Sequence, residues 1–359
     1  MYRKYTNNML GDSYFPTTNI ENFIRKEILG TNLQFQLAKN FRTHPQLLQD
    51  EAQKRGWVTT PMGDGIIGIY NETGHPVGTL KQMLTSATSS SAVAVCARKH
   101  VAKEHFQRAG VPVAEGRSFS LKEREEAAEY VASRTSPVVM KPDRGAAGTD
   151  VVTEVMTAED FDNAWSTISA GKTAGGTVLI EDQFSGIDIR VMIAGGKYVA
   201  ASSRVPGFVV GDGATTFGKL VKASQVERKT NAYLKRMPIQ PDYEWLDRIG
   251  INEDTILEAG KIQVLSLVYN LHQGGINVDL TDRMPAHFVD IAETAARAIP
   301  GLTVAGIDLM VSGLDDDSEA IVLEANTSAN IAVHHYPAYG KAVNVAAKIL
   351  DSLENSLPV

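Results

Sequence analysis

The chain is poor in cysteine, and this scarcity removes several kinds of chemistry from consideration. A single cysteine, Cys96, occurs among 359 residues. One cysteine forms no intrachain disulfide, and it cannot build a metal site from several thiolates. Cys96 also lies in the small apolar run 91–97, which favours a buried packing residue over a nucleophile. We therefore expect a catalytic chemistry that does not depend on a thiol.

Long apolar runs and a surplus of basic residues are also missing. No stretch approaches the roughly 20 apolar residues that cross a bilayer, and the start of the chain, MYRKYTNNML, lacks the apolar core of a signal peptide. The 35 Lys and Arg are outnumbered by 42 Asp and Glu, which gives a net charge of −7. A surface that binds polyanions needs a local basic surplus. We expect a cytoplasmic protein whose partners include neither nucleic acid nor membrane.

What is present is a globular composition in which helices and strands alternate. Hydrophobic residues make up 43% and charged residues 21%, which argues against a disordered scaffold. Helical patterns occur around 20–29 and 45–55, and a strand–turn–strand pattern covers 65–80. The clearest later elements are helices at 98–108, from Ser120 onward with a capping box to Glu123, at 157–170 and at 340–355. Strands are predicted at 138–141, 177–182, 304–311 and 320–324, and a hairpin at 188–205 that turns at Gly195 and Gly196. The recurrent hairpins predict the α+β, or mixed α/β, fold class.

Two acidic strands near the end of the chain carry the strongest local signal. Glu324 and Asn326 are two residues apart on a strand, so both side chains leave the same face. The neighbouring apolar strand presents Asp308. Carboxylate and amide oxygens suit a hard cation such as Mg²⁺. The alternative is a polar strand edge that faces solvent. Both strands are otherwise strongly apolar and should be buried, and buried carboxylates without a counter-charge are costly.

Two further features are weaker when each is taken alone. Lys141 ends an apolar strand and runs into a loop with Gly145 and Gly148, where backbone amides could cradle phosphate oxygens, although such a turn is more often merely a turn. The apolar strand 178–184 ends in acidic residues and is followed by Asp188, which could supply contacts to an adenine edge and a ribose. In isolation this second pattern is nonspecific.

Taken together and in this order, these features resemble the ATP-grasp superfamily of carboxylate–amine ligases. The likeness is sharpest at 204–213, at 274–282, and at 323–328 running on to 334–337. It is strongest toward the ATP-grasp portions of cyanophycin synthetases and of bifunctional glutamate–cysteine ligase/glutathione synthetases. The resemblance implies an ATP-grasp fold with two α+β subdomains that grip ATP.

The resemblance also implies a domain organisation and a set of site residues. Residues 1–95 would form a pre-grasp domain and 96–350 the ATP-grasp domain, with a lid at about 115–182 and a metal-binding subdomain at about 183–350. The residues implied to contact ATP are Lys99, Lys141, Gly145, Gly148, Thr149, Glu181, Asp182, Gln183, Phe184 and Asp188. The residues implied to bind Mg²⁺, or Mn²⁺ in its place, are Asp308, Glu324 and Asn326. The implied catalytic residues are Arg190, Arg204, Asn270 and His334.

Several of these assignments have a structural alternative, and the chain departs from the family at a few positions. Either arginine could instead form a salt bridge on a strand face, and His334 could be structural or orient a substrate. Related ligases have a glycine where this chain has Asp150 and a proline where it has Ala329. D-alanine ligases have an arginine where Gly306 stands, which argues against that substrate class.

The resemblance implies a ligase that joins a carboxylate to an amine. ATP would activate the carboxylate as an acyl phosphate, and ADP and phosphate would be released. The expected partners are small-molecule carboxylate and amine substrates, amino acids or a small peptide, and the expected assembly is a homodimer. The alternatives are a small-molecule kinase on the same fold and a nucleotide-binding module without catalysis. With 359 residues there is room for one ATP-grasp unit and a short N-terminal domain, so we expect a free-standing ligase.

Overall fold

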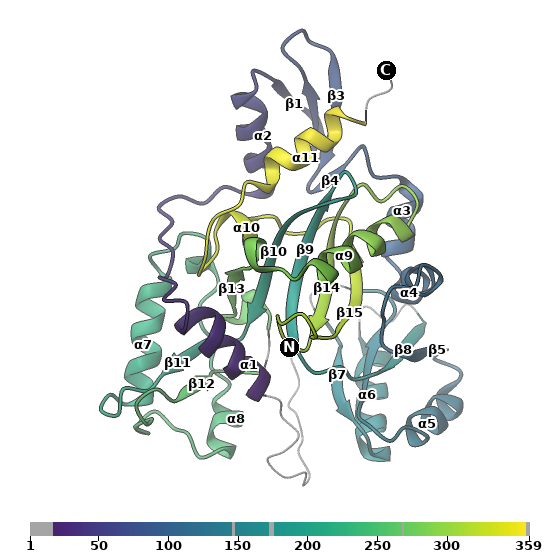
Figure 1. Ribbon diagram of the computed structural model, residues 1–359. Coiled ribbons are helices and arrows are strands. Elements are labelled where there is room, and N and C mark those ends of the chain that lie inside the picture. The colour runs from purple at the N-terminus through teal and green to yellow at the C-terminus, as the bar shows by residue number, and fades with distance from the viewer. Residues whose placement is uncertain (1–16, 146–147, 172–175, 268, 357–359) are drawn as a thin grey trace.

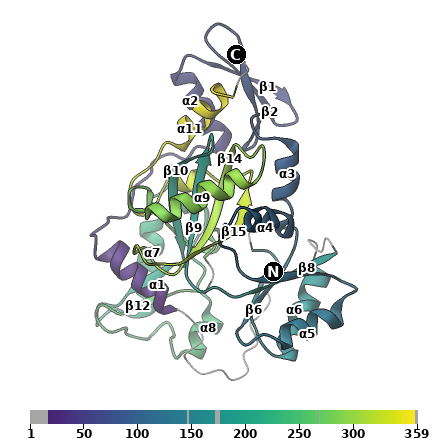
Figure 2. The ribbon, with the colours of Figure 1, turned by 45° about the vertical axis from the view of Figure 1, so that its right-hand side comes forward.

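A five-stranded antiparallel sheet forms the centre of the computed structural model, which describes residues 17–145, 148–171, 176–267 and 269–356. Its strands run in the order β13-β10-β9-β14-β15 (Figure 1). Their bounds are Ile187–Ala194 for β9, Lys197–Val205 for β10, Ile276–Asp279 for β13, Val304–Val311 for β14 and Ala320–Asn326 for β15. Helix α9 (Ala286–Ala298) lies across one face of this sheet and contacts β9, β14 and β15 (Figures 1 and 2).

Strands form where the sequence predicted them for β9, β10, β14 and β15, because most of their residues are apolar, whereas the strand β13 was not predicted. β9 is buried along almost its whole length, as its run of Ile, Val and Met requires. β9 and β10 form the predicted hairpin, and the turn uses Gly195 and Gly196 at φ +61° and +72°. The predicted pairing of the two acidic strands is confirmed as well, since β14 and β15 are antiparallel neighbours with Asp308 opposite Glu324.

A second sheet, with the order β5-β8-β6-β7, carries the helices α5 (Arg124–Ala132) and α6 (Ala158–Ala170). Its strands are β5 (Gly116–Ser120), β6 (Val138–Pro142), β7 (Val152–Val155) and β8 (Thr177–Asp182). The predicted start of a helix at Ser120 is wrong: Ser120 ends β5, and α5 begins at Arg124. The Ser120 amide still donates to Glu123 at 2.7 Å, so the expected local contact exists as a turn before the helix. The assignment of this unit as a lid stays a prediction.

The N-terminal region packs against the other end of the chain. Strands β1 (Val58–Gly63), β2 (Ile66–Tyr70), β3 (Pro76–Lys81) and β4 (Leu84–Thr85) form a meander beside α2 (His44–Lys54). The last helix, α11 (Val345–Glu354), lies against α2 and β3 at the top of Figure 1. Leu48 and Leu80 share a hydrophobic cluster with Ile349 and Leu353, and Arg55 pairs with Asp351 at 2.7 Å. The boundary at residue 95 stays a prediction, and the meander buries its apolar face against the C-terminal helix.

The remaining helices and strands surround the central sheet. Helix α4 (Lys99–Arg108) stands between the central sheet and the second sheet (Figure 2). The other elements are α1 (Thr17–Phe23), the π-helical turn η1 (Ile24–Leu29), α3 (Ser90–Cys96), β11 (Phe208–Val210), α7 (Phe217–Arg228), η2 (Leu234–Arg236), α8 (Tyr243–Arg248), β12 (Ile262–Val264), η3 (Leu271–Gln273), η4 (Thr281–Arg283) and α10 (Ala332–His335). In the part of the chain that the structure describes, no helix is both long and apolar enough to cross a membrane.

Candidate active site

The predicted metal ligands come together on neighbouring strands of the central sheet. Asp308 on β14 lies opposite Glu324 on β15. The side-chain amide of Asn326 donates to Glu324 Oε1 at 3.0 Å and to Asp308 Oδ2 at 3.4 Å, so one amide joins both carboxylates. Asp308 is 3% exposed, which rules out a strand edge that faces solvent for this residue. Two carboxylates and an amide oxygen are the hard ligands that Mg²⁺ takes, so the donor set fits the ion.

Two arginines balance the charge of the buried carboxylates. Arg190 on β9 donates through Nε and Nη2 to both oxygens of Asp308, the second bond at 2.8 Å. Arg204 on β10 lies between Asp188, at 2.9 Å from its Nε, and Asp308, at 3.2 Å from its Nη2. Burial acts to raise the pKa of Asp308, but the two guanidinium groups outweigh it and hold that pKa below its ordinary value. Asp188, predicted to contact ribose, therefore belongs to the same charged network.

Burial and neighbouring charges also shift the pKa values of Asp188 and Arg204. Burial raises the pKa of Asp188, although Arg204 acts against the rise. Burial alone would lower the pKa of Arg204, but Asp188 and Asp308 raise it above the ordinary value. Arg204 consequently stays a cation, and it holds two carboxylates that would otherwise repel one another.

Gly306 and Ala329, two of the positions where the chain departs from related ligases, meet at Arg190. A Cβ atom on Gly306 would lie 2.7 Å from Cδ of Arg190 and 2.6 Å from Cβ of Ala329. Both distances are below normal van der Waals contact, so a side chain at 306 and the observed position of Arg190 exclude each other. The guanidinium that donates to both oxygens of Asp308 thus comes from the neighbouring strand β9.

We expect Gly306→Ala to lower the free energy of unfolding by about 1–3 kcal/mol, because overpacking a buried site forces its neighbours to shift. Arg190 should then hold Asp308 less well, and ATP turnover should fall with stability. Urea denaturation and a turnover assay measure the two effects. Adding Ala329→Gly removes one of the two collisions, so the double variant should recover part of the lost stability. A Gly306→Ala protein as stable and active as wild type would contradict this account of the packing.

The predicted phosphate lysines lie at the junction between the two sheets. Lys99, at the start of α4, donates to the Gly145 carbonyl at 2.9 Å. Its Nζ is also 3.6 Å from Oε2 of Glu324, so it connects the glycine loop to the carboxylate cluster. Lys141, on β6, lies 2.6 Å from Oε2 of Glu181. Burial lowers the pKa of Lys141 to about 8, with Glu324 acting against the shift.

Lys103 is a member of this group that the sequence analysis missed. It lies one helical turn after Lys99 on α4, and its Nζ donates to Oε1 of Glu181 and, at 2.9 Å, to the Ala114 carbonyl. Burial and then the charge of Lys141 lower the pKa of Lys103 to about 7. The i,i+4 spacing of Lys99 and Lys103 was the available signal, since it places both side chains on one face of a helix. Glu181, 3% exposed, is thus enclosed by two lysines.

The side chains predicted for the adenine hinge form hydrogen bonds or packing contacts with neighbouring residues. Asp182 accepts from Arg134, whose Nε lies at 2.9 Å. The side chain of Gln183 accepts from the Glu154 amide at 2.8 Å. Phe184 is half-buried beside Gly186. These contacts fix the path of the chain between β8 and β9, which agrees with a hinge that would read adenine through main-chain groups.

The predicted phosphate loop is described only in part. Residues 146 and 147 lie outside the described residues. Gly145 and Gly148 have φ values of +132° and +70°, and Asp150 has φ +58°. Asp150 thus adopts the left-handed conformation that a glycine adopts without strain, and Asp is among the side chains that tolerate it.

Asn270 and His334 lie in two different surroundings. The side-chain oxygen Oδ1 of Asn270 accepts from the His272 backbone amide at 2.9 Å and so caps η3. His334 on α10 is 2% exposed, and neither ring nitrogen has a hydrogen-bond partner among the described residues. Burial, and next the charge of Arg190, lower its pKa to about 3. His334 is therefore a neutral imidazole near the arginines, with donor and acceptor capacity unused.

The two histidines of α10 make the fold sensitive to acid. Burial lowers the pKa of His334 to about 3 and that of His335 to about 4. An imidazole in the unfolded chain has a pKa near 6.5. Lowering the pH below 6.5 therefore stabilises the unfolded chain relative to the folded one, until the folded-state pKa of each histidine is reached. We expect acidification from pH 7.5 to 5 to cost about 2 kcal/mol through His334 alone. Urea denaturation at both pH values should show that His334→Gln loses about 2 kcal/mol less unfolding free energy on acidification than the wild type does. An unchanged pH dependence of stability in this variant would contradict the assignment.

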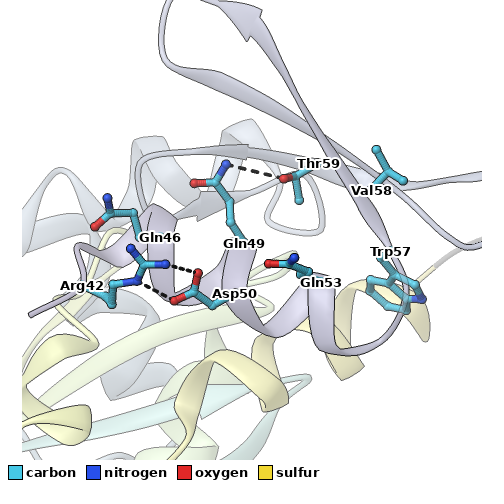
Figure 3. A pocket seen from close by; sticks show the side chains of 8 residues that line it. All are labelled: Arg42, Gln46, Gln49, Asp50, Gln53, Trp57, Val58 and Thr59. Atoms are coloured by element: carbon cyan, nitrogen blue, oxygen red, sulfur yellow. Dashed lines mark hydrogen bonds and ion pairs between the residues drawn. The ribbon is translucent and has the colours of Figure 1, made fainter. Parts of the chain in front are cut away.

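Two other features are separate from this cluster. Burial, followed by the charge of Glu324, raises the pKa of the Cys96 thiol to about 12, as expected for a packing residue. An open hollow of about 510 Å³ lies beside α2 and the start of β1 (Figure 3). It is lined by Arg42, Gln46, Gln49, Asp50, Gln53, Trp57, Val58 and Thr59, none of which belongs to the predicted site. Arg42 and Asp50 are paired within it at 2.6 Å.

Known proteins are similar to parts of this chain. Residues 97–205 match the family model of the ATP-grasp (A) domain of phosphoribosylglycinamide synthetase. The chain is 29% identical over 283 residues to cyanophycin synthetase of Geminocystis herdmanii, across 76% of this chain and 32% of that protein. It is 28% identical over 277 residues to the glutathione biosynthesis bifunctional protein GshAB of Desulfotalea psychrophila, across 75% of this chain and 35% of that protein. The chain thus spans about a third of the length of these relatives.

A solved structure shares the fold. The bifunctional glutathione synthetase of Pasteurella multocida superposes with a TM-score of 0.63 at 23% identity, over 87% of this chain and 44% of that one. The chain therefore has the predicted ATP-grasp fold, and residues 97–205 match an ATP-grasp family model. The chain is also similar to segments of cyanophycin synthetases and of bifunctional glutathione-synthesis proteins, as the sequence motifs predicted.

Proposed function

We propose that this chain joins a carboxylate to an amine at the expense of ATP. ATP, a carboxylic acid and an amine would give an amide, ADP and phosphate. The observation that carries the proposal is the contact of Lys99 with both the Gly145 carbonyl and the Glu324 carboxylate. This contact brings the lysines and loop suited to phosphate binding beside the carboxylates suited to a metal. A ligase of this kind needs both parts in one place.

The chain's own residues would act by charge and position. Lys99 and Lys141 would hold phosphate oxygens of ATP. Arg190 and Arg204 would stabilise negative charge at the γ-phosphate or the acyl phosphate. Mg²⁺, or Mn²⁺, held by Asp308, Glu324 and Asn326, would neutralise charge on the phosphates when bound. No covalent nucleophile is required, because the substrate carboxylate attacks the γ-phosphorus and the amine then displaces phosphate from the acyl carbon.

The substrate class follows from the relatives and from the site. Cyanophycin synthetase and glutathione-synthesis proteins are named for products built from amino acids, so we propose amino acids or a small peptide as substrates. His334 and Asn270 would contribute to holding the acceptor, and the neutral imidazole of His334 would offer it a hydrogen bond. We also propose a homodimer that acts in the cytoplasm.

A screen of amino-acid pairs tests this function. The protein is incubated with ATP, Mg²⁺ and each pair, ADP is quantified, and products are read by mass spectrometry. The expected result is a pair whose condensed product, lighter than the sum of the two by one water, forms with equimolar ADP. A phosphorylated acceptor without an amide would instead identify a small-molecule kinase, and ATP binding without turnover would identify a non-catalytic module.

A further inference from the structure

Glu181 contacts two lysines, Lys103 and Lys141, and only Lys141 has a proposed role at the phosphates of ATP. Its Oε1 accepts from Lys103, and its Oε2 lies 2.6 Å from Lys141. All three groups are almost completely buried. Two lysines thus share one carboxylate, and the charge of Lys141 is one of the causes that lower the pKa of Lys103. A single lysine would be enough to neutralise Glu181, so the second requires an explanation.

The position of Glu181 is fixed by the backbone around it. Glu181 pairs with Gly116 in the register of β5 and β8. A Cβ atom on Gly116 would lie 2.4 Å from the Ile180 carbonyl oxygen and 2.8 Å from Cγ of Glu181. The missing side chain at 116 lets the two strands approach and seats the carboxylate. Glu181 therefore cannot follow a lysine that moves away.

Lys103 has a second hydrogen-bond partner, whereas Lys141 lies close to the charges of Glu324 and Lys99. The Lys103 ammonium is tied to the Ala114 carbonyl at 2.9 Å as well as to Glu181. Lys141 is the second-last residue of β6, four residues before Gly145, and the charges of Glu324 and Lys99 act on it. If Lys141 turned toward a phosphate, Glu181 would lose one counter-ion inside the protein. An unpaired buried carboxylate is strongly unfavourable.

We propose that Lys103 keeps Glu181 paired and thereby frees Lys141 to leave Glu181 for the phosphates of ATP. The proposal rests on the phosphate-binding role proposed above for Lys141. Lys103 itself touches no phosphate: it is a positioning residue that lowers the cost of moving Lys141. Without Lys103, Lys141 would be held by Glu181 as its one remaining partner, and ATP would have to break that pair.

The test is a double-mutant cycle on ATP affinity, measured by calorimetry with Mg²⁺ and the full chain. Lys103→Met is expected to weaken ATP binding about tenfold, and Lys103→Arg, which keeps the cation, should restore most of it. In a Glu181→Gln background no buried carboxylate remains to be compensated, so Lys103→Met should change affinity less than twofold. Lys122→Met, at an exposed lysine of the same subdomain, is the matched control and should bind ATP as the wild type does.

Each other outcome overturns a specific part. An equal loss in both backgrounds would mean that Lys103 acts directly on the nucleotide. Lower thermal stability with unchanged ATP affinity would mean that the Lys103–Glu181 pair is only structural. Either result would overturn the pairing role of Lys103 and leave the ligase proposal intact. A wild-type protein that does not bind ATP would overturn the proposed function itself.

Discussion

Glu324→Gln is expected to lower the rate of ATP turnover by at least about 100-fold, the loss that even outer partners of a metal site can cause. Glu324 supplies one of the two carboxylates of the predicted metal site and lies 3.6 Å from Lys99. Glutamine keeps the size of the side chain and an oxygen for the Asn326 amide, so the fold should persist. The variant should therefore lose turnover without losing its far-ultraviolet circular dichroism or its unfolding midpoint.

Glu319→Gln is the control for that variant. Glu319 precedes β15 and is exposed, so the same chemical change there should leave turnover at the wild-type level. The amine-dependent release of ADP at ordinary Mg²⁺ is the quantity to compare. If Glu324→Gln kept wild-type turnover, the assignment of Glu324 as a metal ligand would fail.

Lys141→Met should have the second large effect, a loss of ATP affinity of about 100-fold. A direct ionic hydrogen bond to phosphate in a buried site contributes about 3 kcal/mol, which corresponds to that factor. The protein should remain folded, because Lys103 still neutralises Glu181 after Lys141 is removed. The variant separates binding from folding for this reason.

Calorimetric titration with ATP and Mg²⁺ gives the affinity, and thermal unfolding without nucleotide gives the stability. A Lys141→Met protein that unfolds near the wild-type midpoint and still binds ATP as tightly would contradict the phosphate assignment. The ATP affinity of Lys141→Arg should lie between that of the wild type and that of Lys141→Met. Arginine keeps the charge but not the compact ammonium that fits beside Glu181.

Much of the central sheet could be predicted, because its signals are local. The strand 304–311 and the strand that ends at Glu324 and Asn326 are apolar runs interrupted by a few polar residues, and the two-residue period fixes which side chains share a face. The glycine pair at 195–196 fixes the hairpin turn in the same way. The convergence of Asp308, Glu324 and Asn326 follows once the two strands are paired.

The features that were missed depend on contacts between distant segments. The sequence around Lys103 is that of an ordinary helix, and only the fold places Glu181 of β8 in contact with it. Gly306 and Ala329 are separate departures in the sequence, and only the position of Arg190 connects them. Ser120 has a partner at the right spacing for a helix cap, but pairing with β8 keeps it in a strand. Tertiary pairing overrides local preference in that case.

The central claim is that a carboxylate is activated as an acyl phosphate, and hydroxylamine tests it most directly because it replaces the unknown amine. A panel of amino acids and short peptides is incubated with the protein, ATP, Mg²⁺ and hydroxylamine, and hydroxamate and ADP are measured together. The account predicts at least one acid that gives hydroxamate and ADP in equal amounts, with Glu324→Gln giving neither. ADP formation with a phosphorylated product that hydroxylamine does not trap would contradict it.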